Sequence, residues 1–221
     1  MKLYKYLPNQ YLDNVVLKGE FLFRSLSYFR DYEDAQVRGD IYEGTQKYAG
    51  ENGLDIHNLT TDLKSKENWV FKSIVDAENI FIFSTSTKLC PDLAREFKSD
   101  VCIEFENLGL LISKLSEAVK RRKSIKPNKL HHGQVNYYEE ETPPGIDWAF
   151  PDRISNGKLD FFSYQSEYRF QLSLRNALAF GNTTQEIQVS DIKKDCVKKE
   201  HSEIILKVGD IRKMCKIHEF K

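Results

Sequence analysis

The chain has 221 residues, and 33 Lys and Arg balance 33 Asp and Glu, so its formal net charge is zero. Hydrophobic residues make up 40% of the sequence and aromatic residues 12%, which fills one substantial core and excludes a disordered chain. The balanced charge argues against a wholly basic nucleic-acid coat, and no run approaches the roughly 18 apolar residues of a transmembrane helix. Pro8 and Asn9 interrupt the N-terminus before the apolar part of a signal peptide, which predicts a cytoplasmic protein.

The first third of the sequence predicts two strands with a helix between them. Leu3–Leu7 is typical of a short strand, and Pro8–Leu17 has helical apolar spacing that ends at Gly19. Glu20–Leu26 alternates as a strand does. The polar, Gly-containing residues that follow, at about 31–68, predict a long loop or lid.

The rest of the sequence adds short strands and one long amphipathic helix, Leu108–Arg121, whose last turn is cationic. About eight strands with two or three helices, not in βαβ alternation, predict a single α+β domain over residues 1–221 with a largely antiparallel sheet. No glycine-rich phosphate loop is present in the sequence. The further strands are expected at Ile80–Phe83, Val101–Phe105, Gln134–Tyr138, Tyr168–Leu174, Glu186–Val189 and Glu203–Val208.

The cysteines and several acidic residues are the possible metal ligands of the sequence. The four cysteines are widely spaced, which predicts free thiols. The spacings of Cys196 to His201 and of Cys215 to His218 do not fit the usual zinc modules. A metal-nuclease site would draw on Asp31, Asp34, Asp40 and Glu43, but no nuclease motif accompanies them, so we predict no metal.

Three short segments stand out, in the order Leu3-Tyr4-Lys5-Tyr6, Ser84-Thr85-Ser86 and Gln165-Ser166-Glu167. The first is a strand followed by a short helix, the second ends a hydrophobic strand, and the third brings polar groups into a strand. In this order they resemble the ADP-ribosyltransferase fold, whose members use a polar residue on the first strand, a central S-T-S strand and a late [QE]-x-E junction. The second and third segments match literally, whereas Lys5 replaces the histidine or arginine of the family. The resemblance implies a mostly antiparallel split sheet, a few short helices and NAD as cofactor.

A broader pattern, from Leu3 to about Ile211, is similar to a widespread bacterial domain family with no settled activity. That family carries an F-N-D-P-x-E element after the second strand and a late E-x-E-[WY]-R strand. Here the first element is Phe29-Arg30-Asp31-Tyr32-Glu33-Asp34, without the Asn and Pro, and the second is Gln165-Ser166-Glu167-Tyr168-Arg169. This similarity supports the fold more than the reaction.

The resemblance implies a role for each polar residue. Cleaving the nicotinamide–ribose bond builds oxocarbenium character, which a carboxylate at Glu167 would stabilise. Gln165 would lie on the same side of an extended segment and orient the nucleophile. The remaining NAD-binding candidates are Ser84 and Thr85 for the ribose, Lys5 and Arg24 for the pyrophosphate, and Tyr6 and Ser86 beside them. Alternatively, the hydroxyls satisfy backbone groups, and Glu167 and Arg169 form an exposed pair.

A basic run follows the long helix. Six cations and two histidines lie within thirteen residues: Lys120, Arg121, Arg122, Lys123, Lys126, Lys129, His131 and His132. Tyr137 and Tyr138 offer stacking surfaces nearby. This composition predicts nucleic-acid contact, although such runs are usually solvated helix ends and Glu139–Glu141 partly offsets the charge.

The leading hypothesis is therefore an NAD-dependent ADP-ribosyltransferase that modifies a nucleic acid or protein, in a toxin, defence or counter-defence setting. Within the family, Q-x-E accompanies asparagine or guanine acceptors, so Gln165 implies a nucleobase or amide acceptor rather than arginine. The alternatives are a non-catalytic nucleic-acid or protein binding module on the same fold, and a nucleotide hydrolase without a macromolecular acceptor.

Overall fold

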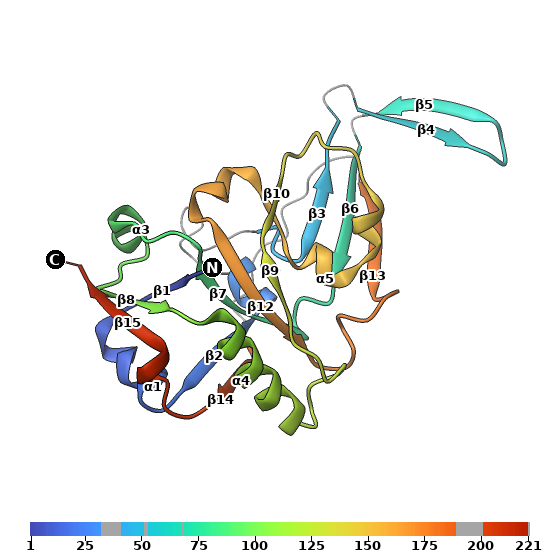
Figure 1. Cartoon of the computed structure of the whole chain (residues 1–221). Helices are drawn as coiled ribbons and strands as arrows, with labels where there is room; N and C mark the ends of the chain where they lie inside the picture. Colours follow the sequence, from blue (N-terminus) through green and yellow to red (C-terminus); the bar gives the residue numbers. More distant parts are fainter. Residues whose placement is uncertain (32–40, 51–52, 68, 189–200, 221) are drawn as a thin grey trace.

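The computed structural model describes residues 1–31, 41–50, 53–67, 69–188 and 201–220, and an antiparallel eight-stranded sheet forms its centre (Figure 1). The α+β class is confirmed. The strands of this sheet are β1 (Leu3–Leu7), β2 (Glu20–Ser25), β7 (Ile80–Ser86), β8 (Val101–Phe105), β9 (His131–Gln134), β12 (Glu167–Ser173), β14 (Glu203–Lys207) and β15 (Cys215–Glu219).

The sheet is split along one edge of β7. On one edge, β12 pairs with the whole of β7. On the other edge, β2 pairs with Phe81 and Ile82 and β1 pairs with Ser86. Among the described strands, none pairs with β7 between these two points. The order is β14-β2-β7-β1-β8-β15, with β12 and then β9 branching from β7.

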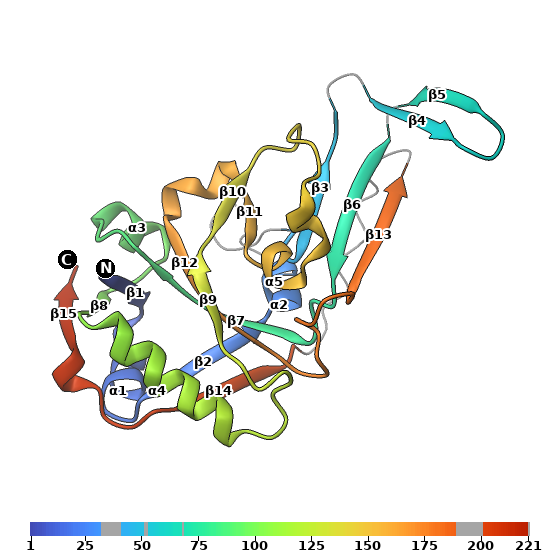
Figure 2. The same cartoon turned by 45° about the vertical axis from the view of Figure 1, so that its right-hand side comes forward.

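The two faces of the sheet differ because side chains alternate along each strand. Phe21 and Phe23 of β2 and Phe83 of β7 lie in the main apolar core, with the buried face of α4 (Leu108–Arg121). Helix α4 buries Leu111, Leu115, Ala118 and Val119, the spacing of an amphipathic helix, and the Asn107 side chain accepts a hydrogen bond from the Leu110 amide at its N-terminus. The turned view shows α4 lying along this core face (Figure 2).

A second, three-stranded sheet consists of β3 (Thr45–Tyr48), β6 (Val70–Val75) and β13 (Thr183–Gln188). The hairpin β4 (Leu54–Asn58) and β5 (Leu63–Glu67) projects beyond it (Figure 1). The expectation of one long loop at 31–68 is therefore wrong for the strand-forming parts of this segment. Its strands are polar rather than alternating, so the sequence lacked a strand pattern. Residues 32–40 lie outside the description.

The smaller elements depart from the expected boundaries where the chain turns sharply. The expected helix at Pro8–Leu17 is a 3-10 turn, Asn9–Tyr11, followed by α1 (Leu12–Val16). The expected strand Gln134–Tyr138 is divided between β9 and β10, and β10 (Asn136–Tyr138) pairs with β11 (Gly157–Leu159) in parallel. The other helices are α2 (Leu26–Arg30), α3 (Pro91–Glu96) and α5 (Pro151–Ile154), and further 3-10 turns occur at Ile146–Ala149, Asp160–Gln165 and Arg212–Met214. Within the described residues, no helix combines the length and apolar character needed to cross a membrane.

Candidate active site

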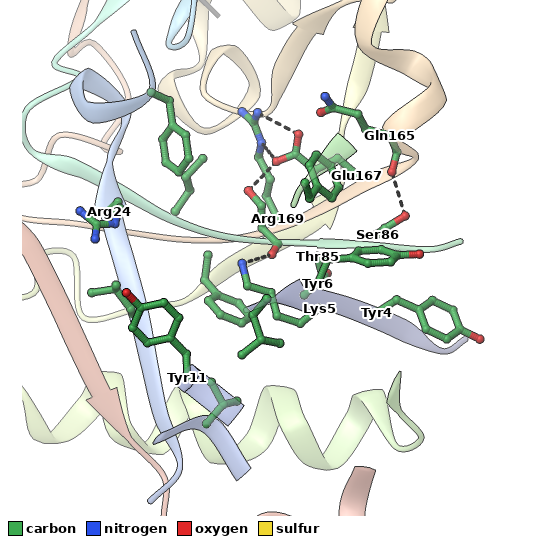
Figure 3. Close-up of a pocket in the computed structure, with 18 of the residues that line it drawn as sticks. Tyr4, Lys5, Tyr6, Tyr11, Arg24, Thr85, Ser86, Gln165, Glu167 and Arg169 are labelled. Carbon is green, nitrogen blue, oxygen red and sulfur yellow. Dashed lines mark hydrogen bonds and ion pairs between the residues drawn. The ribbon is translucent and has the colours of Figure 1, made fainter. Parts of the chain in front are cut away.

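A cavity of about 620 Å³ lies at the split of the sheet, on the face opposite α4. All of the NAD-binding candidates line it, and so do Gln165 and Glu167. In Figure 3, Arg24 lies on one side of the cavity and Gln165 on the other side, and Glu167, Arg169 and Lys5 lie between these two. The cavity volume falls within the roughly 300–1,000 Å³ range of small-molecule sites.

The hydroxyl groups that end β7 hold the segment around Glu167 in place. Ser84 Oγ donates to Glu167 Oε1 at 2.5 Å, so this hydroxyl supports the carboxylate. Thr85 Oγ1 instead donates to the Tyr168 carbonyl at 3.0 Å, and Ser86 Oγ donates to the Gln165 carbonyl at 2.8 Å. The Thr85 and Ser86 hydroxyls therefore bond to the main chain, which matches the backbone alternative.

Gln165 and Glu167 are not related by extended backbone, contrary to expectation. Gln165 ends a 3-10 turn, and Ser166 has left-handed dihedral angles (φ 46°, ψ 50°) before β12 begins at Glu167. The Glu167 amide donates to the Tyr137 hydroxyl at 2.8 Å. Both side chains nevertheless reach one place, because Lys158 contacts each of them.

Glu167 belongs to a buried cluster of four charged side chains, Glu43, Lys158, Glu167 and Arg169, which we name the charge cluster. Arg169 is fully buried, and its N–H groups donate to both carboxylates and to the Ser155 carbonyl. Lys158 Nζ lies 3.3 Å from Glu167 Oε2 and 3.6 Å from Glu43 Oε1. The idea that Glu167 and Arg169 form an exposed pair is wrong.

The charge cluster keeps Glu167 ionised. Burial by itself raises the pKa of the Glu167 carboxyl, but the Arg169 and Lys158 cations outweigh burial and hold that pKa well below its usual range, and hydrogen bonds from Arg169 and Ser84 act in the same direction. Burial by itself lowers the pKa of Arg169, but Glu167 and Glu43 outweigh burial and hold that pKa above its usual range. The site therefore presents a fixed carboxylate rather than a titrating acid.

Two glycines allow the outer members of the charge cluster to reach β12. Gly44 has a φ of +69°, and an added Cβ would lie 3.0 Å from side-chain atoms of Leu26 and Val75. At Gly157, which precedes Lys158, an added Cβ would lie 2.7 Å from Nε2 of Gln46, so the Gln46 side chain would have to move. Glu43 and Lys158 thus each stand beside a glycine whose backbone packs closely against neighbouring side chains.

Lys5 and Tyr6 make structural contacts at the cavity wall. Lys5 Nζ donates to the Ser84 carbonyl at 2.8 Å, at the part of β7 that lies between its pairings with β1 and β2. The Tyr6 hydroxyl donates to the Lys88 carbonyl and accepts from the Cys90 amide, both at 2.7 Å. Burial is the main cause that raises the pKa of Tyr6 to about 12. Lys5 thus satisfies a backbone acceptor at the split.

Arg24 is the cation at the far end of the cavity. Its guanidinium lies 4.3 Å from the centre of the Tyr28 ring and 3.5 Å from a carboxylate oxygen of Glu203. Its side chain is 34% exposed, so water competes with both contacts. Arg24 therefore combines a positive charge with access from solvent.

The basic run lies away from this site. Lys120, Arg121, Arg122 and Lys123 are exposed at the C-terminal end of α4, which covers the other face of the sheet. Of the described residues that line the cavity, none comes from this run. Arg122 also donates to the Ile205 carbonyl at 3.0 Å. The structure does not bring the nucleic-acid candidates together with Glu167.

The expected F-x-D element and the acidic residues are only partly described. Residues 32–34 and 40 lie outside the described residues, and Asp31 pairs with His201 at 3.5 Å. Glu43 binds Arg169 rather than acting in a cluster of carboxylates. Among the described residues, no group of three or more His, Cys, Asp or Glu side chains is arranged to hold a metal ion. Three cysteines, Cys90, Cys102 and Cys215, are free thiols, and Cys196 is not described.

Sequence reasoning missed Glu43 and Lys158 as parts of the site. Both stand next to a glycine, in Glu43-Gly44 and Gly157-Lys158, and this is the only local signal that they share. Comparisons of the chain with protein-family models, curated proteins and solved structures found no match. The resemblance to the ADP-ribosyltransferase fold therefore remains a prediction.

Proposed function

We propose that the protein is an NAD-dependent ADP-ribosyltransferase that uses the cavity at the split of the sheet and modifies a nucleic acid or a protein. One observation carries the proposal. Glu167, the carboxylate of the Q-x-E segment, lies in the cavity wall and accepts a hydrogen bond from Ser84 of the S-T-S strand. Two segments 83 residues apart in sequence thus meet at one carboxylate, as the resemblance implies.

The chemistry of NAD cleavage suits a permanently ionised Glu167. Loss of nicotinamide leaves positive charge on the ribose, and a fixed carboxylate stabilises it without prior proton transfer. The lowered pKa of Glu167 supplies that charge at every physiological pH. Burial strengthens the interaction because fewer water molecules screen it.

The separation of Arg24 from Glu167 and Gln165 across the cavity suits an extended, anionic ligand. An NAD molecule with its pyrophosphate near Arg24 would place the nicotinamide ribose toward Glu167 and the leaving group or acceptor toward Gln165, in the order seen in Figure 3. Tyr28 beside Arg24 adds an aromatic surface for a base. For Lys5, the contact with the Ser84 carbonyl favours a structural role over pyrophosphate binding.

A specific observation favours a second candidate, a binding module without catalysis. Ser84 and Arg169 donate to Glu167 Oε1, and Lys158 and Arg169 donate to Oε2, so protein donors occupy the four usual acceptor positions of this carboxylate. A ribose hydroxyl would have to displace Ser84 or Lys158. If neither contact yields, the cavity binds a ligand and leaves it intact.

The deciding experiment compares wild type with Glu167→Gln in labelled NAD and total cell lysate, with and without nuclease. We expect NAD consumption and transferred label in wild type, and a loss of roughly 10²–10³-fold in the variant, because a neutral isostere cannot stabilise the ribosyl cation. Glu104→Gln is the matched control. Glu104 is also buried and pairs with a cation, Lys2, but it lies outside the cavity lining.

Each outcome separates the candidates. Near wild-type turnover by Glu167→Gln, with Glu104→Gln unchanged, would contradict the transferase proposal. Calorimetric binding of NAD without any consumption would favour the binding module. Label on material destroyed by nuclease would identify a nucleic-acid acceptor. Label on protein arginine would contradict the nucleobase or amide acceptor that Gln165 implies.

A further inference from the structure

Lys158 lines the cavity, where it balances the carboxylates of the charge cluster and also contacts Gln165. Its ammonium lies 3.0 Å from Gln165 Oε1, and its side chain is 4% exposed. The same ammonium lies 4.5 Å from the centre of the Phe162 ring, which closes one side of it. Lys158 is therefore fixed between Gln165 and the carboxylates of the charge cluster.

The chemistry of an ammonium group determines which way the Gln165 amide is turned. An ammonium has N–H donors and no acceptor, so the amide atom that faces Lys158 must be the oxygen. The Gln165 nitrogen is then turned to the Tyr164 hydroxyl, to which it donates at 3.3 Å. With its oxygen accepting from Gln165, the Tyr164 hydroxyl can direct its own proton outward.

We propose that Lys158 is a positioning residue that fixes this donor direction from Gln165 to Tyr164, so that the site takes an acceptor group whose edge carries an oxygen lone pair. The proposal rests on the transferase function and deepens it. Tyr164 is 37% exposed, so an incoming macromolecule can reach the outer end of this hydrogen-bonded series. A carbonyl oxygen of a base or of an amide fits this direction, whereas a guanidinium or ammonium, which only donates, does not.

The first test needs no NAD. The side-chain amide of Gln165 is followed by ¹⁵N–¹H NMR and assigned by its disappearance in Gln165→Glu. We expect its protons to exchange with solvent at least about tenfold faster in Lys158→Met than in wild type, and Lys158→Arg, which keeps the N–H donors, to restore protection. Lys72→Met is the matched control, because buried Lys72 also donates to a glutamine oxygen, that of Gln188, outside the cavity.

The second test measures transfer and NAD hydrolysis separately. Lys158→Met should lower transfer at least about tenfold more than it lowers hydrolysis, because Gln165 can then present either end of its amide. Lys158→Arg should restore the ratio of transfer to hydrolysis. Tyr164→Phe, at a partly exposed position, should shift the ratio in the same direction as Lys158→Met, and it carries the test if Lys158→Met does not fold.

The two proposals fail in different ways. If wild type consumes no NAD, the transferase function fails, and the exchange of the Gln165 amide still tests the positioning role. If wild type transfers label but Lys158→Met changes neither the exchange rate nor the ratio of transfer to hydrolysis, Lys158 does not position Gln165. If Tyr164→Phe leaves the ratio of transfer to hydrolysis unchanged, Tyr164 is not the outer end of the hydrogen-bonded series that runs from Lys158 through Gln165.

Discussion

Two regions of this neutral protein concentrate charge, and they do so in opposite ways. In the charge cluster, two cations and two carboxylates are buried together, and each cation lies within ion-pair distance of both carboxylates. In the basic run, like charges stand side by side on the exposed end of α4. Arg169 and Arg121 carry the same functional group, but only Arg169 is enclosed by acceptors.

This difference in burial indicates that the charge cluster, and not the basic run, is the stronger evidence for a functional site. Stability alone does not explain the charge cluster, because well-packed apolar side chains commonly replace a buried ion group at little cost. The cluster also faces a cavity, and perturbed buried charges in a cavity are typical of functional sites. The basic run needs no such explanation, because solvated cations at a helix C-terminus are ordinary.

The largest expected effect comes from removing the centre of the charge cluster. Arg169→Met should lower the free energy of unfolding by about 3–5 kcal/mol, because two carboxylates would stay buried without their main cation. The matched substitution Arg121→Met should change it by no more than about 0.5 kcal/mol. Urea unfolding followed by circular dichroism measures both, and similar losses in the two variants would show that the cluster is not enclosed as described.

The pH dependence of stability should also differ between the regions. The folded-state pKa of Glu167 is lowered, so the stability that its ionisation contributes is complete above its ordinary pKa of 4.5 and is lost as the pH falls below that value. Between about pH 6 and pH 3, wild type should therefore lose more free energy of unfolding than Glu167→Gln. Glu117→Gln, an exposed change on α4, controls for the loss of one negative charge and should follow wild type.

A smaller effect should come from the hydroxyl groups at the end of β7 and directly after it. Ser84→Ala removes a hydrogen bond to a charged group and should cost about 1.5–3 kcal/mol in the free energy of unfolding. Thr87→Val removes a hydroxyl that donates to the neutral Ser166 carbonyl at 3.2 Å, and should cost about 1 kcal/mol. An equal cost at both positions, measured by urea unfolding, would indicate that Ser84 is not coupled to the charge cluster.

The sequence predicted the parts of the fold that apolar periodicity determines. Leu3–Leu7, Val101–Phe105 and Leu108–Arg121 are found at the expected bounds. Val101–Phe105 is buried along its whole length, as a short apolar run predicts, and the buried residues of Leu108–Arg121 recur with the period of a helix. The segment after Asp31 was not predicted as strands, because β3 buries Gln46 and Lys47, which are typical of loops. Tertiary packing, rather than local sequence pattern, determines the strand conformation of that segment.

The candidate site was predicted in part for a similar reason. Ser84, Gln165 and Glu167 stand in short motifs that can be recognised locally, and they meet at the cavity. Glu43 contacts Arg169 across 126 residues of sequence, and no local pattern encodes such a pairing. The left-handed Ser166 was also unpredictable, because serine rarely adopts that conformation and glycine would have signalled it.

The smallest expected effect on stability belongs to the basic run, where a change should appear in binding instead. Arg121→Gln with Lys123→Gln should alter the free energy of unfolding by no more than about 0.5 kcal/mol per substitution, because both side chains are exposed. Arg122 is left intact because it donates to the Ile205 carbonyl. If the run binds duplex DNA, the slope of log K against log salt should fall in magnitude by about 0.9 for each phosphate that the double variant no longer neutralises.

Fluorescence anisotropy with a labelled duplex, titrated at several salt concentrations, measures that slope. Glu167→Gln tested in parallel should leave it unchanged, because the cavity lies on the other face of the sheet from α4. If wild type and the double variant have the same slope of log K against log salt, the run is only a solvated helix end. A weaker slope without any change in NAD-dependent transfer would make the run a separate nucleic-acid binding surface, since its cations do not line the cavity in which Glu167 lies.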